Sequence, residues 1–203
     1  QFVSIIRNAS IPLLFTALIS QLVSTFIASY RWFLIMKTLQ LGGDLKFYIK
    51  CYFKGAYFNQ LLPSSIGGDA LRVLEVSSLG FRKREAFYGI FVDRIVGLIG
   101  LILLNLTANI FSRGHLPEWL YNIINLISAA GLAGFFILIT FGHMEFLKKY
   151  KLTRLIHHLS DNFRRVYNSF INVVVQLALS VLIHLASVLS LYFIGRSFSM
   201  DYS

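Results

Sequence analysis

The sequence has little charge and almost no cysteine for its length. Only 14% of its 203 residues are charged, whereas soluble domains average about 25%. With 56% hydrophobic residues and a mean hydropathy of +0.67, the protein surface faces something other than water. Cys51 is the single cysteine, which excludes an intrachain disulfide and leaves the redox compartment open.

Motifs of several enzyme classes are also missing. The chain has no Gly-x-Ser-x-Gly elbow, no Walker loop and no dinucleotide-binding fingerprint. His157 and His158 are adjacent, so on a helix they point about 100° apart and are poorly placed to share an ion. We therefore expect no metal and no cofactor. Without an ATP-binding motif, any transport is expected to be passive or gradient-coupled unless a partner supplies energy.

Long uncharged segments are what the sequence does have. A helix needs about 20 apolar residues to cross a hydrocarbon core of about 30 Å. Four segments meet this need and predict spans over about 11–39, 86–111, 119–141 and 170–194. The predicted fold is an all-α, polytopic transmembrane helical bundle, one domain over residues 1–203. Buried core helices of a soluble protein are the alternative, but these require only shorter apolar runs.

The placement of the basic residues predicts the orientation of the chain. A net charge of +10 is compatible with nucleic-acid binding, but lysine and arginine concentrate in 37–85 and 142–169, and only Arg113 lies between the second and third spans. The positive-inside rule places the basic segments in the cytoplasm. Arg113–Glu118 and both termini are then outside a cell membrane, and no nucleic-acid partner is expected. No signal-peptide pattern precedes the first span, and an outside amino terminus that leads into a span is more natural if an earlier span has been cut off, so we expect a fragment of a longer membrane protein.

An amphipathic, broken segment, residues 44–79, connects the first two spans. Lys46, Lys50 and Lys54 recur at four-residue intervals and share one face of a predicted helix over 45–62. This face is either simply solvated or a basic track for anionic headgroups at the cytoplasmic interface. A second amphipathic cytoplasmic helix is predicted over 144–168.

The predicted helix over 45–62 is followed by residues that break helices. Pro63 and Gly67-Gly68 disrupt the backbone pattern, and the helix is predicted to restart at Asp69. Because both flanks are expected in the cytoplasm, the break is compatible with a re-entrant segment that enters the membrane and returns on the same side. In a membrane, such irregular backbone survives only where it is buried in protein or lines a cavity.

The second span contains a charged pair, Asp93-Arg94. Gly89, Gly97 and Gly100 recur with Asp93 at helical spacing, and small residues let helix backbones approach closely in lipid. Asp93 is therefore expected to face a neighbouring helix, with Arg94 rotated by about 100° and extending towards the cytoplasm. His184, alone in the last span, is expected to form an interhelical hydrogen bond.

Charged groups in spans are costly and mark functional sites, and an arginine near a glycine-rich helix start suits a phosphate. Other interpretations stay open: Asp69 as a helix cap, the arginines as structural ion-pair partners, and Arg31 as an interface anchor. The candidate lipid-binding residues are Arg31, Asn59, Gln60, Pro63, Gly67, Gly68, Asp69, Arg72, Asp93 and Arg94.

These residues resemble a known family. The strings that carry the resemblance are Tyr30-Arg31-Trp32, the run from Tyr52 to Pro63, Gly67-Gly68-Asp69-Ala70-Leu71-Arg72 and the run from Asp93 to Leu98. They are similar to the lysylphosphatidylglycerol synthase transmembrane-region family of flippase-like membrane proteins. The resemblance covers roughly residues 30–195.

The resemblance implies lipid translocation. In the multiple-peptide-resistance proteins this region moves aminoacylated phosphatidylglycerol across the membrane, while a soluble domain, absent here, performs the aminoacylation. Stand-alone relatives are linked to polyprenyl-phosphate sugar pathways. The expected partners are therefore membrane lipids: an anionic or aminoacylated phospholipid, or a polyprenyl phosphate.

Two rival functions stay open. One is a lipid-linked headgroup or glycosyl transferase with Asp69 or Asp93 as base, although no nucleophile or metal cluster accompanies them. The other is a membrane scaffold that recruits a cytoplasmic synthase through the basic helices. A second copy of the chain is a further candidate partner.

Overall fold

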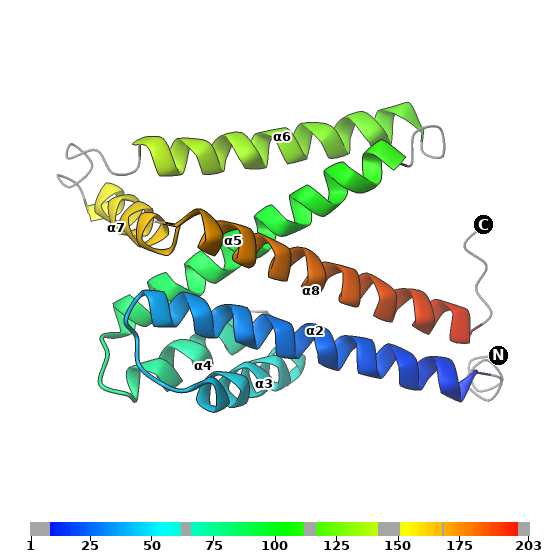
Figure 1. The fold of residues 1–203 in the computed structure, drawn as a ribbon, viewed down its shortest axis with the longest axis horizontal. Helices are drawn as coiled ribbons and strands as arrows, with labels where there is room; N and C mark the ends of the chain where they lie inside the picture. Colours follow the sequence, from blue (N-terminus) through cyan, green and yellow to red (C-terminus); the bar gives the residue numbers. More distant parts are fainter. Residues whose placement is uncertain (1–8, 62–65, 112–116, 142–150, 168, 199–203) are drawn as a thin grey trace.

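The protein is an all-α bundle. The computed structural model describes residues 9–61, 66–111, 117–141, 151–167 and 169–198, and within these ranges the chain forms seven helices and no strand. Figure 1 shows them in chain order: α2 (Ile11–Thr38), α3 (Leu45–Leu61), α4 (Ile66–Ser77), α5 (Lys83–Phe111), α6 (Glu118–Phe141), α7 (Lys151–Val166) and α8 (Phe170–Ser197).

Four of these helices are long and apolar enough to cross a membrane. They are α2, α5, α6 and α8, which confirms the four predicted spans. The predicted bounds differ from the observed ones by at most three residues: α5 begins at Lys83 rather than 86, and α8 continues to Ser197 rather than 194. Polar hydroxyls along the spans are satisfied locally, since Thr16 and Thr25 each donate to the carbonyl four residues earlier, as side chains in hydrocarbon require.

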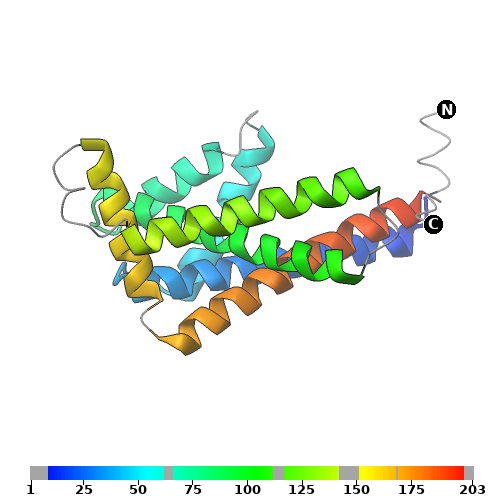
Figure 2. The ribbon, with the colours of Figure 1, turned by 90° about the horizontal axis from the view of Figure 1, so that it is seen from above.

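Helices α2 and α8 run antiparallel and lie side by side over most of their length (Figures 1 and 2). The Ser10 amide donates to the Ser197 carbonyl at 3.0 Å, and further along the pair the hydroxyls of Ser24 and Ser187 lie 2.9 Å apart. Helix α5 crosses this pair, and α6 packs on α5. Close packing of helices in hydrocarbon relies on small residues and interhelical hydrogen bonds. Both are present at the interface between α2 and α8.

Helices α3 and α4 form an antiparallel hairpin beside α2 and α5. At its base, Gly43 faces the Leu79 side chain, and near its tip Gly55 meets the backbone of Gly68. The chain thus returns to the end of the molecule from which it departs, which is the geometry that a re-entrant segment needs. Whether this hairpin enters the membrane stays a prediction.

The hairpin also corrects one prediction about the break. The second helix begins at Ile66 and not at Asp69, so Gly67 and Gly68 lie within its first turn. Pro63 lies outside the described residues.

Asp44 caps the start of α3. It accepts a hydrogen bond from the Phe47 amide at 2.9 Å, as its position before the helix predicts.

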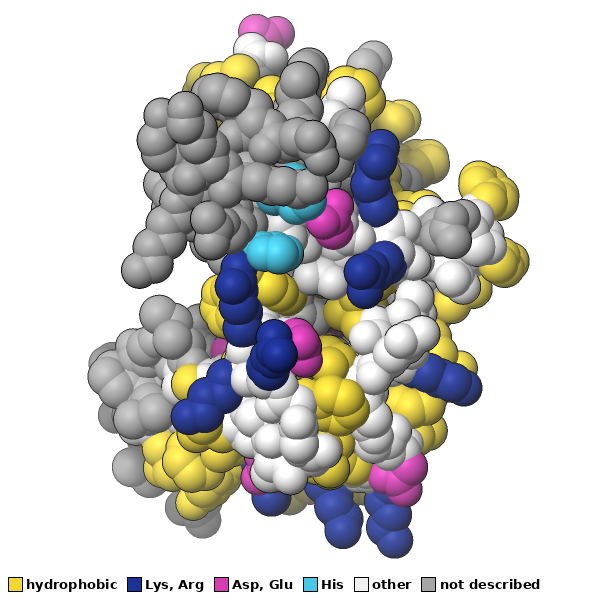
Figure 3. All heavy atoms as spheres, turned by 90° about the vertical axis from the view of Figure 1, so that its left-hand side faces the viewer, with side chains coloured by type: hydrophobic (Ala, Val, Ile, Leu, Met, Phe, Trp, Pro, Cys, Tyr) yellow, Lys and Arg dark blue, Asp and Glu magenta, His cyan; other side chains and the backbone are white. Residues whose placement is uncertain are grey.

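Most charged side chains gather at one end of the bundle. Figure 3 shows this end, where lysine, arginine, acidic and histidine side chains lie together. Helix α7 packs on α5, α6 and α2 here, with Leu159, Phe163 and Val166 buried and Arg164 and Arg165 exposed. This confirms the amphipathic pattern predicted for the described part of 144–168.

Candidate functional site

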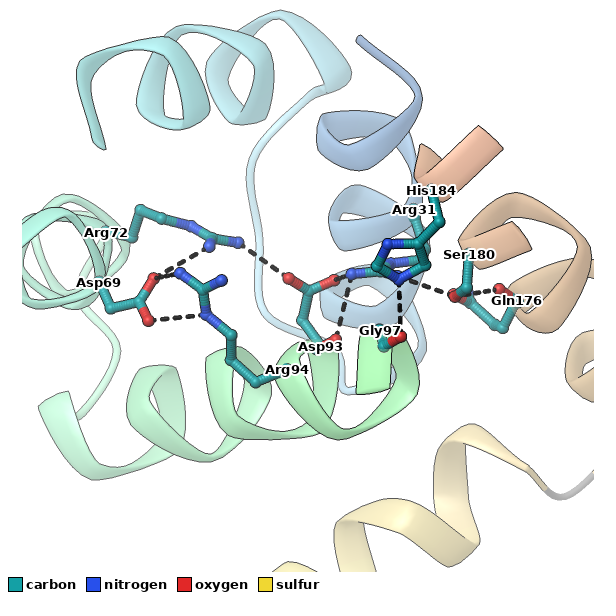
Figure 4. Close-up of polar contacts among 9 residues, drawn as sticks. All are labelled: Arg31, Asp69, Arg72, Asp93, Arg94, Gly97, Gln176, Ser180 and His184. Carbon is teal, nitrogen blue, oxygen red and sulfur yellow. Dashed lines mark hydrogen bonds and ion pairs between the residues drawn. The ribbon is translucent and has the colours of Figure 1, made fainter. Parts of the chain in front are cut away.

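Five charged side chains form a continuous array through α2, α4 and α5. Figure 4 shows their order, Arg31–Asp93–Arg72–Asp69–Arg94, in which cations and anions alternate. The exposed fraction of the side chains is 6%, 2%, 3%, 25% and 49% in that order. The array therefore runs from the interior of the bundle to an open end at Arg94.

Asp93 is the central anion of this array. Its Oδ1 accepts from Arg31 Nε at 3.0 Å, and its Oδ2 accepts from Arg72 Nη2 at 3.3 Å. Because buried charges persist only when they are paired, this carboxylate joins α2, α4 and α5. Its burial confirms the prediction that Asp93 faces a neighbouring helix and not lipid.

Arg31 extends the polar contacts to α8. Its Nη1 donates to Ser180 Oγ at 2.8 Å, and Ser180 in turn donates to the Gln176 carbonyl at 2.8 Å. The interpretation of Arg31 as an interface anchor is therefore wrong, because its side chain is buried inside the bundle. Gly97 makes room for it, since a Cβ there would lie 3.3 Å from Arg31 Nη2.

Arg72 is held by aromatic rings as well as by carboxylates. Its guanidinium carbon lies 4.0 Å from the ring centroid of Trp32 and 4.5 Å from that of Tyr52, within the range of cation–π attraction. Arg72 Nε and Trp32 Nε1 are buried without a hydrogen-bond partner among the described residues. The cation–π contacts are therefore the described interactions of this face of the guanidinium.

Asp69 and Arg94 close the array at its open end. Arg94 donates from Nε to Asp69 Oδ2 at 2.8 Å and from Nη2 to Oδ1 at 2.7 Å, a two-point contact of the strong type. Arg72 Nη1 also donates to Asp69 Oδ1 at 3.2 Å. Asp69 is the fourth residue of α4, so its interpretation as a helix cap is wrong.

A groove of about 550 Å³ lies between α4 and α5, with the Asp69–Arg94 pair in its wall. Its other lining residues are apolar: Ala70, Val73, Leu74, Phe87, Ile90 and Phe91. Volumes of this size suit small ligands. An apolar groove bordered by an exposed arginine is complementary to an amphipathic molecule.

Close contact of α3 and α4 positions Asp69 and Arg72 over α5. The Asn59 carboxamide oxygen accepts from the Gly68 amide at 2.8 Å, which satisfies one of the free donors at the start of α4. A Cβ at Gly68 would collide with the Gly55 carbonyl and with Asn59. Glycine at 68 is thus required by the close approach of the two helices.

The candidate residues fall into three groups in the structure. Arg31, Asp69, Arg72, Asp93 and Arg94 make up the array, and Asn59, Gly67 and Gly68 belong to the hairpin that supports it. Gln60 is exposed on the last turn of α3, and Pro63 lies outside the described residues. Arg94 extends to Asp69 on α4, and its extension towards the cytoplasm stays a prediction.

Three residues around the array were not predicted as site residues. Trp32 and Tyr52 occur in the strings that resemble the family, and Ser180 lies in the last span. Ser180 lies midway between Gln176 and His184 at four-residue intervals, and this polar stripe on an apolar helix was a usable signal.

His184 itself places Nε2 2.9 Å from the Gly97 carbonyl, which confirms its predicted interhelical hydrogen bond.

The histidine pair on α7 is closer than expected. One ligand atom each from His157, His158 and Asp161 lie within 4.8 Å of one another, and His157 Nδ1 is 3.0 Å from Asp161 Oδ2. The expectation that adjacent histidines point too far apart is therefore wrong for these rotamers. His158 also stacks on Tyr88 of α5, so this cluster helps attach α7 to the bundle.

Comparison with known proteins agrees with this architecture. The family model described as lysylphosphatidylglycerol synthase TM region matches residues 1–203. Searches of curated proteins and of solved structures return no match. Because the family model covers the whole chain, this membrane protein belongs to the lysylphosphatidylglycerol synthase transmembrane-region family.

Proposed function

We propose that this protein binds an amphipathic lipid in the groove between α4 and α5 and moves its headgroup across the membrane. The observation that carries the proposal is the apolar groove with the half-exposed Arg94 in its wall. Hydrocarbon would pack against Val73, Leu74 and Phe91. The guanidinium would bind a phosphate, which it can contact through two parallel hydrogen bonds. Phosphatidylglycerol, its aminoacylated form and a polyprenyl phosphate all carry a phosphate on apolar chains, so each is a candidate ligand.

Translocation also needs a polar path, because a desolvated headgroup in hydrocarbon is costly. Polar contacts continue from Arg94 along the array, through Asp69, Arg72, Asp93 and Arg31, to Ser180 on α8. This path is buried in the structure, so a headgroup can follow it only if α4 moves relative to α5. The hairpin attachment of α4 would allow such movement while both of its ends stay on the cytoplasmic side.

The contacts of the carboxylates favour transport over the transferase alternative. Both oxygens of Asp69 and both oxygens of Asp93 accept hydrogen bonds from guanidinium groups. A general base must reach the proton that it removes, whereas these carboxylates position arginines. We therefore assign Asp69 and Asp93 to holding the array.

The test is lipid retention by the full-length protein, measured by native mass spectrometry after gentle extraction. Ala70→Phe places a large ring in the groove, and Ala129→Phe makes the same change on the exposed surface of α6. We expect wild type and Ala129→Phe to retain the same phospholipid or prenyl phosphate and Ala70→Phe to lose it. Equal retention by all three would contradict the groove assignment.

A further inference from the structure

The charged array has an odd number of members. Three arginines alternate with two aspartates, so Arg31, Asp93, Arg72, Asp69 and Arg94 together carry one net positive charge. The neighbouring Lys54–Glu75 pair, 2.6 Å apart, adds no net charge. Among the described residues, no other acidic side chain forms an ion pair with the array.

This excess positive charge matters because of where the array lies. An unpaired charge in a low-dielectric interior is costly, and both inner arginines are almost fully buried. Arg94 is the array's only cation with an accessible side chain, at 49% exposed. One monoanion beside Arg94 would therefore make the whole array neutral, whereas a zwitterion or a cation would leave the excess in place.

We infer that the groove selects a lipid whose headgroup carries one net negative charge, such as a phosphatidylglycerol-type phosphodiester, and that Arg94 determines this selection. The inference rests on the proposed function. Arg94 would turn from Asp69 to the phosphate. Asp69 would keep its contact with Arg72 at 3.2 Å, so no buried carboxylate would lose its partner.

The apolar lining limits the ligand to lipids. Phe87, Ile90 and Phe91 on α5 face Val73 and Leu74 on α4 across the groove. Burying hydrocarbon there contributes binding energy in proportion to the apolar area covered. A free glycerol phosphate would have only the Arg94 contact, so it should compete poorly with a chain-bearing lipid.

The experiment compares lipids that differ only in headgroup charge. The purified full-length protein is offered equimolar phosphatidylglycerol, phosphatidylethanolamine and lysyl-phosphatidylglycerol with identical acyl chains, and bound lipid is counted by native mass spectrometry. We expect phosphatidylglycerol to be preferred by about tenfold, the effect of one charge contact at a half-exposed position. Excess glycerol phosphate should leave the bound lipid in place.

Arg94→Gln removes the excess charge, and we expect it to bind the three lipids about equally. Arg164→Gln makes the same charge change on the exposed face of α7, where Arg164 lies outside the groove lining, and should keep the preference. Asp69→Asn raises the net charge of the array to +2 and should strengthen the preference for phosphatidylglycerol. This variant still tests the inference if the Arg94→Gln protein does not fold.

The outcomes separate this inference from the proposed function. Lipid binding without a charge preference, or a preference unchanged in Arg94→Gln, would overturn the inference and leave lipid binding intact. Displacement of lipid by glycerol phosphate alone would also overturn it. Failure of wild type to retain any of the lipids would overturn the proposed function and the inference together.

Discussion

Arg31 and Asp93 meet in the interior of the bundle, with Arg31 Nη2 2.9 Å from Asp93 Oδ1 and side chains that are 6% and 2% exposed. Asp93 also binds Arg72. One carboxylate thus compensates buried charge from two other helices. We therefore expect the stability of the bundle and the geometry of the open end at Arg94 to depend on this contact.

Replacing Asp93 with alanine should destabilise the protein strongly. The change leaves Arg31 and Arg72 buried with too few partners, and breaking a buried pair on one side costs about 3–5 kcal/mol. The free energy of unfolding in detergent micelles measures the effect. Glu75→Ala is the control, because its ion pair with Lys54 is partly exposed and should contribute less than about 1 kcal/mol. Similar losses in both variants would contradict the central role of Asp93.

Gly68→Ala should separate α3 from α4. The new methyl group would collide with the Gly55 carbonyl and Asn59, and overpacking of this kind typically costs about 1–3 kcal/mol. Gly134→Ala is the matched control, since no atom lies within 4 Å of its added Cβ and alanine favours helix. Thermal unfolding should show a lower midpoint for the first variant only. An unchanged midpoint for Gly68→Ala would contradict the close approach of the two helices.

The aromatic contacts of Arg72 predict a graded response at Tyr52. Tyr52→Leu removes the ring that lies 4.5 Å from the guanidinium, and we expect a loss of about 1–2 kcal/mol in unfolding free energy. Tyr52→Phe retains the ring and should lose much less. Equal losses in the two variants would instead assign the effect to the hydroxyl group.

Cys51 should be unreactive at neutral pH. Burial, followed by the nearby Glu75 carboxylate, raises the pKa of the Cys51 thiol to about 11, and only the thiolate is nucleophilic. Labelling by iodoacetamide should be slow at pH 8 in the folded protein and fast after denaturation. Rapid labelling of folded protein at pH 8 would contradict the buried environment.

The same shift in the Cys51 pKa predicts a pH dependence of stability. The folded state holds this proton more tightly than the unfolded state, whose thiol has an ordinary pKa of about 9. Stability from this group is therefore complete below about pH 9 and is lost as the pH rises through about 11. Cys51→Ser should reduce this part of the alkaline decline in unfolding free energy.

Much of the fold was predictable because a membrane restricts the choices of the chain. Uncharged runs of about 20 residues are typical of spans, so the bounds of α2, α5, α6 and α8 followed within three residues. The predicted start of α4, at Asp69, was wrong because glycine commonly lies at the end of a helix, so the two preceding glycines were expected outside it. Here Gly67 and Gly68 lie inside the first turn, where close packing against α3 outweighs their low helix propensity.

Five of the candidate residues form one charged array, but their pairing could not be predicted from the sequence. The three-residue spacing indicates that Asp69 and Arg72 share a face of a helix. The ion pair between Arg94 and Asp69, in contrast, depends on how α4 lies across α5. Ser180 was not predicted because a single serine in an apolar span carries little signal unless its spacing from Gln176 and His184 is considered. Its contact with Arg31 arises only from the antiparallel packing of α2 and α8.

The most direct test of the account is lipid movement in sealed proteoliposomes that contain the full-length protein. A short-chain fluorescent phosphatidylglycerol is incorporated in both leaflets, and dithionite quenching measures how fast inner-leaflet lipid becomes accessible. The account predicts rapid quenching of the inner pool with wild type and Ala129→Phe, and a rate close to that of protein-free vesicles with Ala70→Phe. Wild-type rates equal to those of protein-free vesicles, or an undiminished rate with Ala70→Phe, would contradict it.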